Sequence, residues 1–269
     1  MSSKSQPDDM IVVRDLTKSF SGRSVLDGIS VTVKKGDVLV IMGGSGCGKS
    51  TLLRQIIGLS KPDSGEVWIR GQEITRMEER KFSEMRKKFG MLFQSGALFN
   101  SMTVGENVSL PILEHTKLAE EVVNIMVKIK LELVGLTGFE HLMPSEISGG
   151  MKKRVGLARA IAMDPELLFC DEPSAGLDPV MTAVIDTLMV DLSRKLGMTL
   201  VVVTHDMASA FRIATKMVML FQGKLVASGT PEYIKALDNP IVKQFINGEA
   251  DGPIPLRLSS DDYLKNLLG

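Results

Sequence analysis

A phosphate-binding loop is the clearest chemical signal in this chain. The spacing G-x-x-x-x-G-K-[ST] is met by one continuous run: Gly43, Gly44, Ser45, Gly46, Cys47, Gly48, Lys49, Ser50 and Thr51. Glycines let the backbone approach a phosphate without an intervening Cβ, and N–H groups at a helix start supply positive potential. Lys49 would bring a cation to the β- and γ-phosphates, and Ser50 a hydroxyl ligand for Mg²⁺. An apolar run precedes the loop and helical spacing follows it, so we predict a nucleoside triphosphate site.

Two acidic residues end another apolar run. Residues 167–170 are apolar and lead into Asp171 and Glu172, which predicts carboxylates at the carboxyl edge of a parallel sheet, where α/β ligands bind. Asp171 suits a Mg²⁺ ligand, and Glu172 suits a general base that polarises the attacking water. An exposed acidic loop is the alternative, but the phosphate loop favours the chemical interpretation.

Two neutral side chains stand at comparable positions. His205 follows three valines and a threonine at 201–204, where it could hydrogen-bond the γ-phosphate. Gln94 follows the short run 90–93, where an amide can reach Mg²⁺ or the attacking water. A surface histidine and an ordinary glutamine are the alternatives. His115 and His141 have no such context, and we assign them no role.

A second helix start can also bind an anion. Ser148, Gly149 and Gly150 precede a helical stretch at 152–163, and Ser-Gly-Gly at a helix start exposes N–H groups to phosphate. The chain has two such starts but one loop lysine. If the second start served a partner's nucleotide, two chains would pair head to tail around ATP. The run Lys152, Lys153 and Arg154 could bind a polyanion, but we expect a solvated helix face.

Length, charge and composition narrow the class of protein. The chain has 269 residues, with 32 basic and 32 acidic side chains, so no global field attracts nucleic acid or anionic lipid. The two cysteines, Cys47 and Cys170, lie in nucleotide motifs and favour a reducing compartment over a disulfide framework. The apolar runs are far shorter than the roughly 20 residues that cross a bilayer. We therefore expect a soluble chain that reaches a membrane only through partners.

The order of elements predicts a mixed α/β architecture. Antiparallel strands are expected near 10–13, 25–33 and 65–71, and parallel strands at 167–170 and 199–203. Helices are expected over much of 77–162, including 120–133, and over 179–196 and 207–214. We expect a disordered lead at 1–9, a nucleotide-binding domain at 10–247 and a tail at 248–269. Residues 262–268 could form a short amphipathic helix on a partner chain, or fray.

These motifs together resemble the ATP-binding cassette family. The resemblance covers about 10–247 and rests on Phe20, the loop at 43–51, Gln94, Ser148 to Gly150, Asp171-Glu172, the run 174–178 and His205. It implies an α/β P-loop NTPase core with a parallel sheet, an antiparallel β subdomain and an α-helical signature subdomain, with ATP and Mg²⁺ as cofactors.

The resemblance also implies individual roles. Phe20 would stack on adenine, where the family usually has tyrosine. Ser148 and Gly150 would contact the partner's γ-phosphate, and Asp178 belongs to a loop that couples the two sites. The family's signature is Leu-Ser-Gly-Gly-Gln, and this chain has Ile147 and Met151 at its outer positions.

Three further segments resemble, in their sequence, the ATPases of Mce-type lipid transporters, the maintenance-of-lipid-asymmetry group. These segments are 91–104, 142–146 and 248–255. The resemblance implies two copies of this chain, a permease dimer, an Mce-domain lipid-binding protein and a STAS-domain protein at the cytoplasmic face of a bacterial inner membrane. Phospholipid would move between the inner and outer membranes. Ala97, Leu98, Phe99 and Met102 would dock a permease helix, or pack in the core.

Other functions stay open at this point. The chain could serve another importer or exporter with a small-molecule substrate. Soluble cassettes acting on DNA or ribosomes carry a coiled-coil insertion or a second cassette, which this sequence lacks. A nucleotide sensor without hydrolysis is less favoured, because Glu172 and His205 are both present.

Overall fold

A twisted sheet of mostly parallel strands forms the centre of the protein, which a computed structural model describes over residues 8–254. Its strands are β3 (Val38–Gly43), β6 (Phe89–Leu92), β7 (Leu167–Asp171), β8 (Thr199–Val203), β9 (Lys216–Phe221) and β10 (Lys224–Gly229). They lie in the order β10-β9-β3-β8-β7-β6. All neighbouring pairs are parallel except β9 and β10, which form an antiparallel hairpin.

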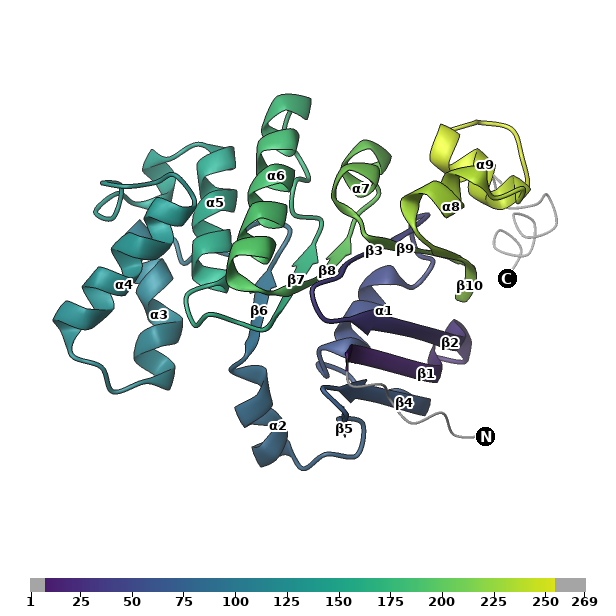
Figure 1. The fold of residues 1–269 in the computed structure, drawn as a ribbon, viewed down its shortest axis with the longest axis horizontal. Helices are drawn as coiled ribbons and strands as arrows, with labels where there is room; N and C mark the ends of the chain where they lie inside the picture. Colours follow the sequence, from purple (N-terminus) through teal and green to yellow (C-terminus); the bar gives the residue numbers. More distant parts are fainter. Residues whose placement is uncertain (1–7, 255–269) are drawn as a thin grey trace.

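A smaller antiparallel sheet lies beside it. This sheet contains β1 (Asp9–Phe20), β2 (Arg23–Lys34), β4 (Ser64–Ile69) and β5 (Gln72–Glu73), in the order β2-β1-β4-β5. The helix α1 (Lys49–Ile56) follows the phosphate loop and lies between the two sheets (Figure 1).

Successive residues of the parallel strands point to opposite faces, so each strand contributes to two cores. Val40, Cys170 and Val202 belong to one buried cluster, and Ile41, Phe169 and Val201 to the other. The first cluster packs against α5 (Gly149–Ala160), α6 (Pro179–Leu196) and α7 (Met207–Ile213), and the second contains α1 and the antiparallel sheet. The strands are therefore covered on both faces, as their unbroken apolar runs indicate.

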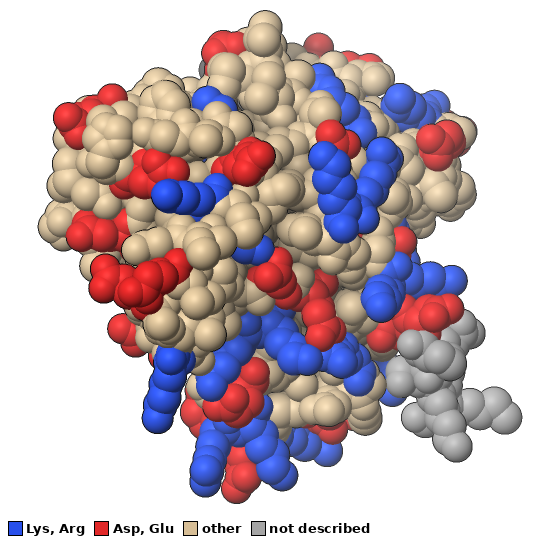
Figure 2. Space-filling view, turned by 60° about the vertical axis from the view of Figure 1, so that its left-hand side comes forward, with Lys and Arg blue, Asp and Glu red and all other residues tan. Residues whose placement is uncertain are grey.

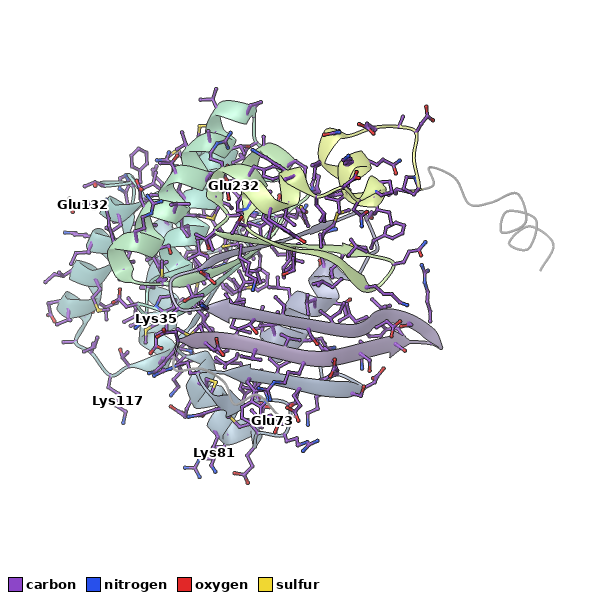
Figure 3. All side chains as sticks on the ribbon, turned by 45° about the vertical axis from the view of Figure 1, so that its right-hand side comes forward. Lys35, Glu73, Lys81, Lys117, Glu132 and Glu232 are labelled. Carbon is purple, nitrogen blue, oxygen red and sulfur yellow. The ribbon has the colours of Figure 1, made fainter. Side chains whose placement is uncertain are left out.

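Helices gather at one end of the large sheet. They are α2 (Glu79–Arg86), α3 (Val104–His115), α4 (Glu120–Leu133) and the 3₁₀ turn η1 (Pro144–Glu146), with α5 beside them (Figure 1). Thr103 caps α3, and Glu106 returns a hydrogen bond to the Thr103 N–H in a capping box. Figure 3 shows Lys81, Lys117 and Glu132 on this side of the ribbon, and all three are exposed.

The last described elements are α8 (Pro231–Ala236) and α9 (Pro240–Asn247). Buried Gln244 of α9 holds the segment that follows, donating to the carbonyls of Glu249 and Ile254 and accepting from the Ile254 N–H. Ile254 packs against the core, so the start of the tail adds to it. The expected tail helix at 262–268 lies outside the described residues, as does most of the expected lead.

The predicted α/β fold class is confirmed. The helices expected at 120–133 and 179–196 have those bounds, and so does the strand at 199–203. The prediction did not place β9, β10, α8 or α9. Both cysteines are free and buried. Within residues 8–254, no helix combines the length and the apolar character needed to cross a bilayer.

Candidate functional site

The phosphate loop connects β3 to α1, and two of its glycines allow close backbone contacts. Gly43 has φ +145°, and a Cβ there would lie 2.3 Å from the Leu220 carbonyl oxygen of β9. Gly48 has φ +105°, and a Cβ there would lie 2.7 Å from the Val25 carbonyl oxygen of β2. The loop is thus held between the two sheets, which fixes its position relative to both.

Lys49 curls over the loop. Its ammonium donates to the Gly43 and Gly44 carbonyls, at 2.8 Å in both cases. The neighbouring Cys47 is buried, and burial raises the pKa of its thiol although Lys49 acts to lower it. A raised pKa disfavours the reactive thiolate. We therefore assign Cys47 a space-filling role in the loop.

The loop residues fit a nucleotide phosphate and Mg²⁺. The helix α1 begins without a side-chain cap and with no acidic residue in its first turn, so its N–H groups are left for an anion. The predicted metal ligands Ser50, Gln94 and Asp171 offer oxygen atoms, which Mg²⁺ prefers. Within the described part of the chain, no cluster of three His, Cys, Asp or Glu side chains forms a metal cage.

Glu172 and His205 meet at the carboxyl ends of β7 and β8. The His205 Nδ1 atom lies 2.7 Å from Glu172 Oε1, and Thr204 Oγ1 donates to Glu172 Oε2 at 3.3 Å. The Glu172 side chain is 14% exposed and the His205 side chain 69% exposed. Glu172 thus has one oxygen fixed by a buried threonine and the other by a histidine at the surface. We did not identify Thr204 from the sequence, where a hydroxyl after three valines gives no distinctive signal.

Asp171 and Gln94 line one open cleft. The cleft has a volume of about 530 Å³ and is lined by Phe93, Gln94, Ser95, Asp171, Ala175 and Gly176. Burial raises the pKa of the Asp171 carboxyl, and Glu172 raises it further, whereas Arg54 and Lys49 lower it. A bound cation would act in the same direction as Arg54 and Lys49, because it favours the charged carboxylate.

The second anion-binding helix start is formed by α5. Ser148 caps the helix, accepting a hydrogen bond from the Met151 N–H at 3.3 Å. Gly149 has open space around it, while a Cβ on Gly150 would lie 2.8 Å from Met181 Cε of α6. Among the described residues, the hydrogen bonds of Ser148 stay within α5. The structure does not join this segment to the chain's own phosphate loop.

Phe20 and Asp178 occupy separate positions at the edges of the site. Phe20 ends β1, is 51% exposed and has the Lys18 ammonium 5.4 Å from its ring centre. Its ring face is available to a planar ligand. Asp178 caps α6 through hydrogen bonds from the N–H groups of Val180 and Met181. It therefore orients the start of the helix that packs beside Gly150.

The expectation that residues 152–154 form a solvated helix face is wrong for two of the three. Lys153 is 7% exposed, and its ammonium donates to the Gln94 backbone carbonyl. Arg154 donates to the carbonyls of Val134 and Gly135. The reason is that neighbouring segments cover α5 on more than one side. The sequence of α5 alone does not show this.

An apolar groove opens beside Gln94. It has a volume of about 470 Å³, and its lining includes Phe93, Ala97, Phe99, Leu110, Arg159 and Met163. Phe99 is 50% exposed, whereas Leu98 is half-buried against the core. Core packing therefore holds for Leu98, whereas Phe99 is left exposed at the groove. Figure 2 shows charged residues of both signs interspersed on the face it displays.

Comparison with known families identifies the class. Residues 26–175, more than half of the chain, match the ABC transporter family. The chain therefore belongs to this family, as one of its ATP-binding, ATP-hydrolysing cassettes.

Individual relatives are similar over nearly the whole chain. The intermembrane phospholipid transport system ATP-binding protein MlaF of Escherichia coli K12 is 44% identical over 97% of each chain. MlaF of Haemophilus influenzae is 44% identical over 96% of this chain and 98% of its own. A probable ribonucleotide transport ATP-binding protein, mkl, of Mycobacterium tuberculosis H37Rv is 43% identical over 94% of this chain and 70% of its own.

Solved structures share the fold. The cassette MJ0796, a dimer in a post-hydrolysis state bound to ADP and Pi, matches with a TM-score of 0.76 and 30% identity over 82% of this chain and 99% of its own. The cbiO1 protein of Clostridium perfringens, part of the ABC transporter complex cbiONQ, matches with a TM-score of 0.80 and 30% identity over 90% of this chain and 96% of its own.

The close contact at Gly43 makes a testable prediction. Gly43→Ala should lower the free energy of unfolding by about 2 kcal/mol, because the new Cβ meets a backbone carbonyl and the φ is unfavourable for alanine. Gly44→Ala is the matched control, since a Cβ there meets nothing within 4 Å, and should change it by less than about 0.5 kcal/mol. Urea denaturation measures both. Equal effects would contradict the assigned contact.

Proposed function

We propose that this chain is the ATP-hydrolysing subunit of a bacterial inner-membrane complex that transports phospholipid between the inner and outer membranes. The observation that carries the proposal is the 44% identity to two phospholipid transport ATP-binding proteins over almost the full length of each chain. The similarity extends beyond the 150-residue family match at 26–175 and includes the segment that packs against α9.

In this proposal, the residues at the edge of the sheet hold Mg·ATP. The loop at 43–51 cradles the phosphates, and Ser50, Gln94 and Asp171 hold Mg²⁺. Bound Mg²⁺ neutralises charge on the phosphate oxygens. Lys49 moves from the loop carbonyls toward the β- and γ-phosphates, because a phosphate is a stronger partner for an ammonium than a neutral carbonyl. Phe20 stacks on the adenine.

Glu172 acts as the general base toward the attacking water. Its two oxygens contact His205 and Thr204, so its carboxylate is oriented before substrate arrives. His205 is exposed enough to contact a γ-phosphate while its Nδ1 remains with Glu172. Oriented in this way, Glu172 aligns the water and accepts its proton as the bond from the water oxygen to the γ-phosphorus forms and the bond from the γ-phosphorus to the bridging oxygen breaks, releasing ADP and phosphate.

A second copy of the chain completes each site. The start of α5, with Ser148, Gly149 and Gly150, has no hydrogen bond to the chain's own phosphate loop among the described residues, and its N–H groups can bind an anion. One relative, the cassette MJ0796, is dimeric in two solved structures, which supports pairing of two chains. We propose that they pair head to tail with two ATP molecules between them. Asp178 would link the two sites through the start of α6.

The apolar groove beside Gln94 is the proposed permease contact. Phe93, Ala97 and Phe99 offer apolar surface at the end of the same loop that holds Gln94. A helix of the permease dimer seated there would sense movement of Gln94. An Mce-domain lipid-binding protein and a STAS-domain protein complete the proposed complex, with this chain peripheral at the cytoplasmic face.

A small-molecule transporter is the second candidate. The relative named as a probable ribonucleotide transport protein is almost as similar, at 43% identity. The two candidates share the ATPase chemistry and differ in the other subunits and the cargo.

Glu172→Gln tests the assignment of the base. The variant should bind ATP with unchanged affinity but hydrolyse it about 10²–10⁴-fold more slowly, and it should accumulate as a closed dimer. Glu166→Gln is the control, because Glu166 lies at the opposite end of β7 and pairs with Arg70 and Lys88. Steady-state phosphate release and size-exclusion chromatography with ATP provide the measurements. Normal turnover by Glu172→Gln would rule out the base assignment.

Purification of the complex from the source cells tests the cargo. A tag on this chain should recover a permease, an Mce-domain protein and bound phospholipid, and the vesicle-reconstituted complex should move labelled phospholipid only with ATP. Recovery of a small-molecule binding protein, with no lipid, would favour the second candidate. Lipid analysis by mass spectrometry decides between them.

Phe99→Ser tests the groove. Loss of the exposed ring should reduce recovery of the permease about tenfold or more, since interface aromatics carry much of the binding energy. Leu59→Ser is the control, because Leu59 is similarly exposed (58%) but does not line the groove. Quantitative immunoblotting after pull-down measures recovery, and thermal melting checks folding. Equal recovery with both variants would place the permease elsewhere.

A further inference from the structure

The helix α5 contacts the Gln94 loop at three successive levels. Lys153 donates to the Gln94 carbonyl, and Arg159 donates to the carbonyls of Gly96 and Ala97 at 2.7 and 2.8 Å. Between them, Gly156 lies so close that a Cβ would be 3.2 Å from Gly96 Cα. These contacts lie at i, i+3 and i+6, on one face of the helix. The Gln94 loop therefore contacts α5 from Lys153 to Arg159.

Lys153 differs from the other contacts because its charge is buried. It is 7% exposed, and within residues 8–254 it makes no ion pair within 4 Å. Burial lowers the pKa of the ammonium, and the nearby Glu172 carboxylate raises it. A neutral donor would satisfy the Gln94 carbonyl without the cost of burying a charge. The charge instead strengthens this hydrogen bond, because a charged donor binds a carbonyl more strongly than a neutral donor does.

We propose that Lys153 is a positioning residue for ATP hydrolysis: its buried ammonium fixes the backbone at Gln94. The proposal rests on the roles assigned above to Gln94 and Glu172. Lys153 does not contact nucleotide in this arrangement. It acts through the Gln94 loop, so its removal should lower turnover more than it weakens nucleotide binding.

The position of Lys153 on α5 gives it a second consequence. The same helix begins at Ser148, the proposed contact to the partner's ATP. Movement of α5 toward that ATP carries the Gln94 loop with it through Lys153, Gly156 and Arg159. Binding at one site is thereby transmitted to the water-aligning groups of the other.

Steady-state ATP hydrolysis by the full chain, in its purified membrane complex, tests the proposal. Lys153→Met keeps the length of the side chain and removes charge and donor, Lys153→Arg keeps both, and Lys152→Met is the matched control on the adjacent, more exposed lysine. We expect Lys153→Met to lower kcat about tenfold with KM for ATP within about twofold, and Lys153→Arg to recover most of kcat. Lys152→Met should leave both constants unchanged.

A double-mutant cycle with Gln94→Ala separates positioning from folding. If Lys153 acts through the Gln94 side chain, Lys153→Met should cost much less in the Gln94→Ala background than alone. Additive losses, or an unchanged kcat in Lys153→Met, would overturn the proposal. A loss in Lys153→Met that Lys153→Arg does not rescue, accompanied by a lower melting temperature, would also overturn it. A neutral Gln94→Ala would instead show that the assigned role of Gln94 fails.

Discussion

The register of four parallel strands determines where the functional residues at the edge of the sheet lie. Leu92, Cys170, Val202 and Val40 pair across β6, β7, β8 and β3 in one row. Two residues beyond that row, the chain reaches Gln94, Glu172, Thr204 and Met42, directly before the phosphate loop. Four segments that are widely separated in sequence therefore reach the same edge of the sheet. A slip of one residue in any strand would turn its terminal side chain to the other face.

The backbone conformation at Glu172 then determines the direction of the side chains at this edge of the sheet. Glu172 has φ +50°, a left-handed conformation that costs a non-glycine residue roughly 1 kcal/mol or more. Its N–H donates to the Val203 carbonyl, so the unfavourable angle is enforced by the neighbouring strand. The turn directs the Glu172 carboxylate toward Thr204 and His205, while Asp171 remains with Gln94 in the cleft. Asp171 and Glu172 are adjacent in sequence, but their carboxylates thus lie in different parts of the site.

Much of the fold and site could be predicted because the informative signals are local. The runs before Asp171 and His205 are short, apolar and buried on both faces, and the phosphate loop carries its own spacing. Lys153 could not be predicted, since helix periodicity shows which residues share a face but not which segment covers that face. Thr204 was missed because a threonine is common after a strand. The hairpin of β9 and β10 was also missed, although Gly223 marks its turn.

The helix α5 connects three parts of the molecule that the strand register does not connect: the helix start at Ser148, the Gln94 loop and the groove. Ser148 stands at its start, Lys153 lies beneath the Gln94 loop, and Arg159 lines the groove next to Phe99, with its guanidinium 5.9 Å from that ring. An α-helix is stiff over such a length, so a displacement at Ser148 reaches Arg159 with little loss. In the proposed complex, a permease helix in the groove and an ATP at the helix start would therefore act on one rigid element. Coupling in either direction needs no other path.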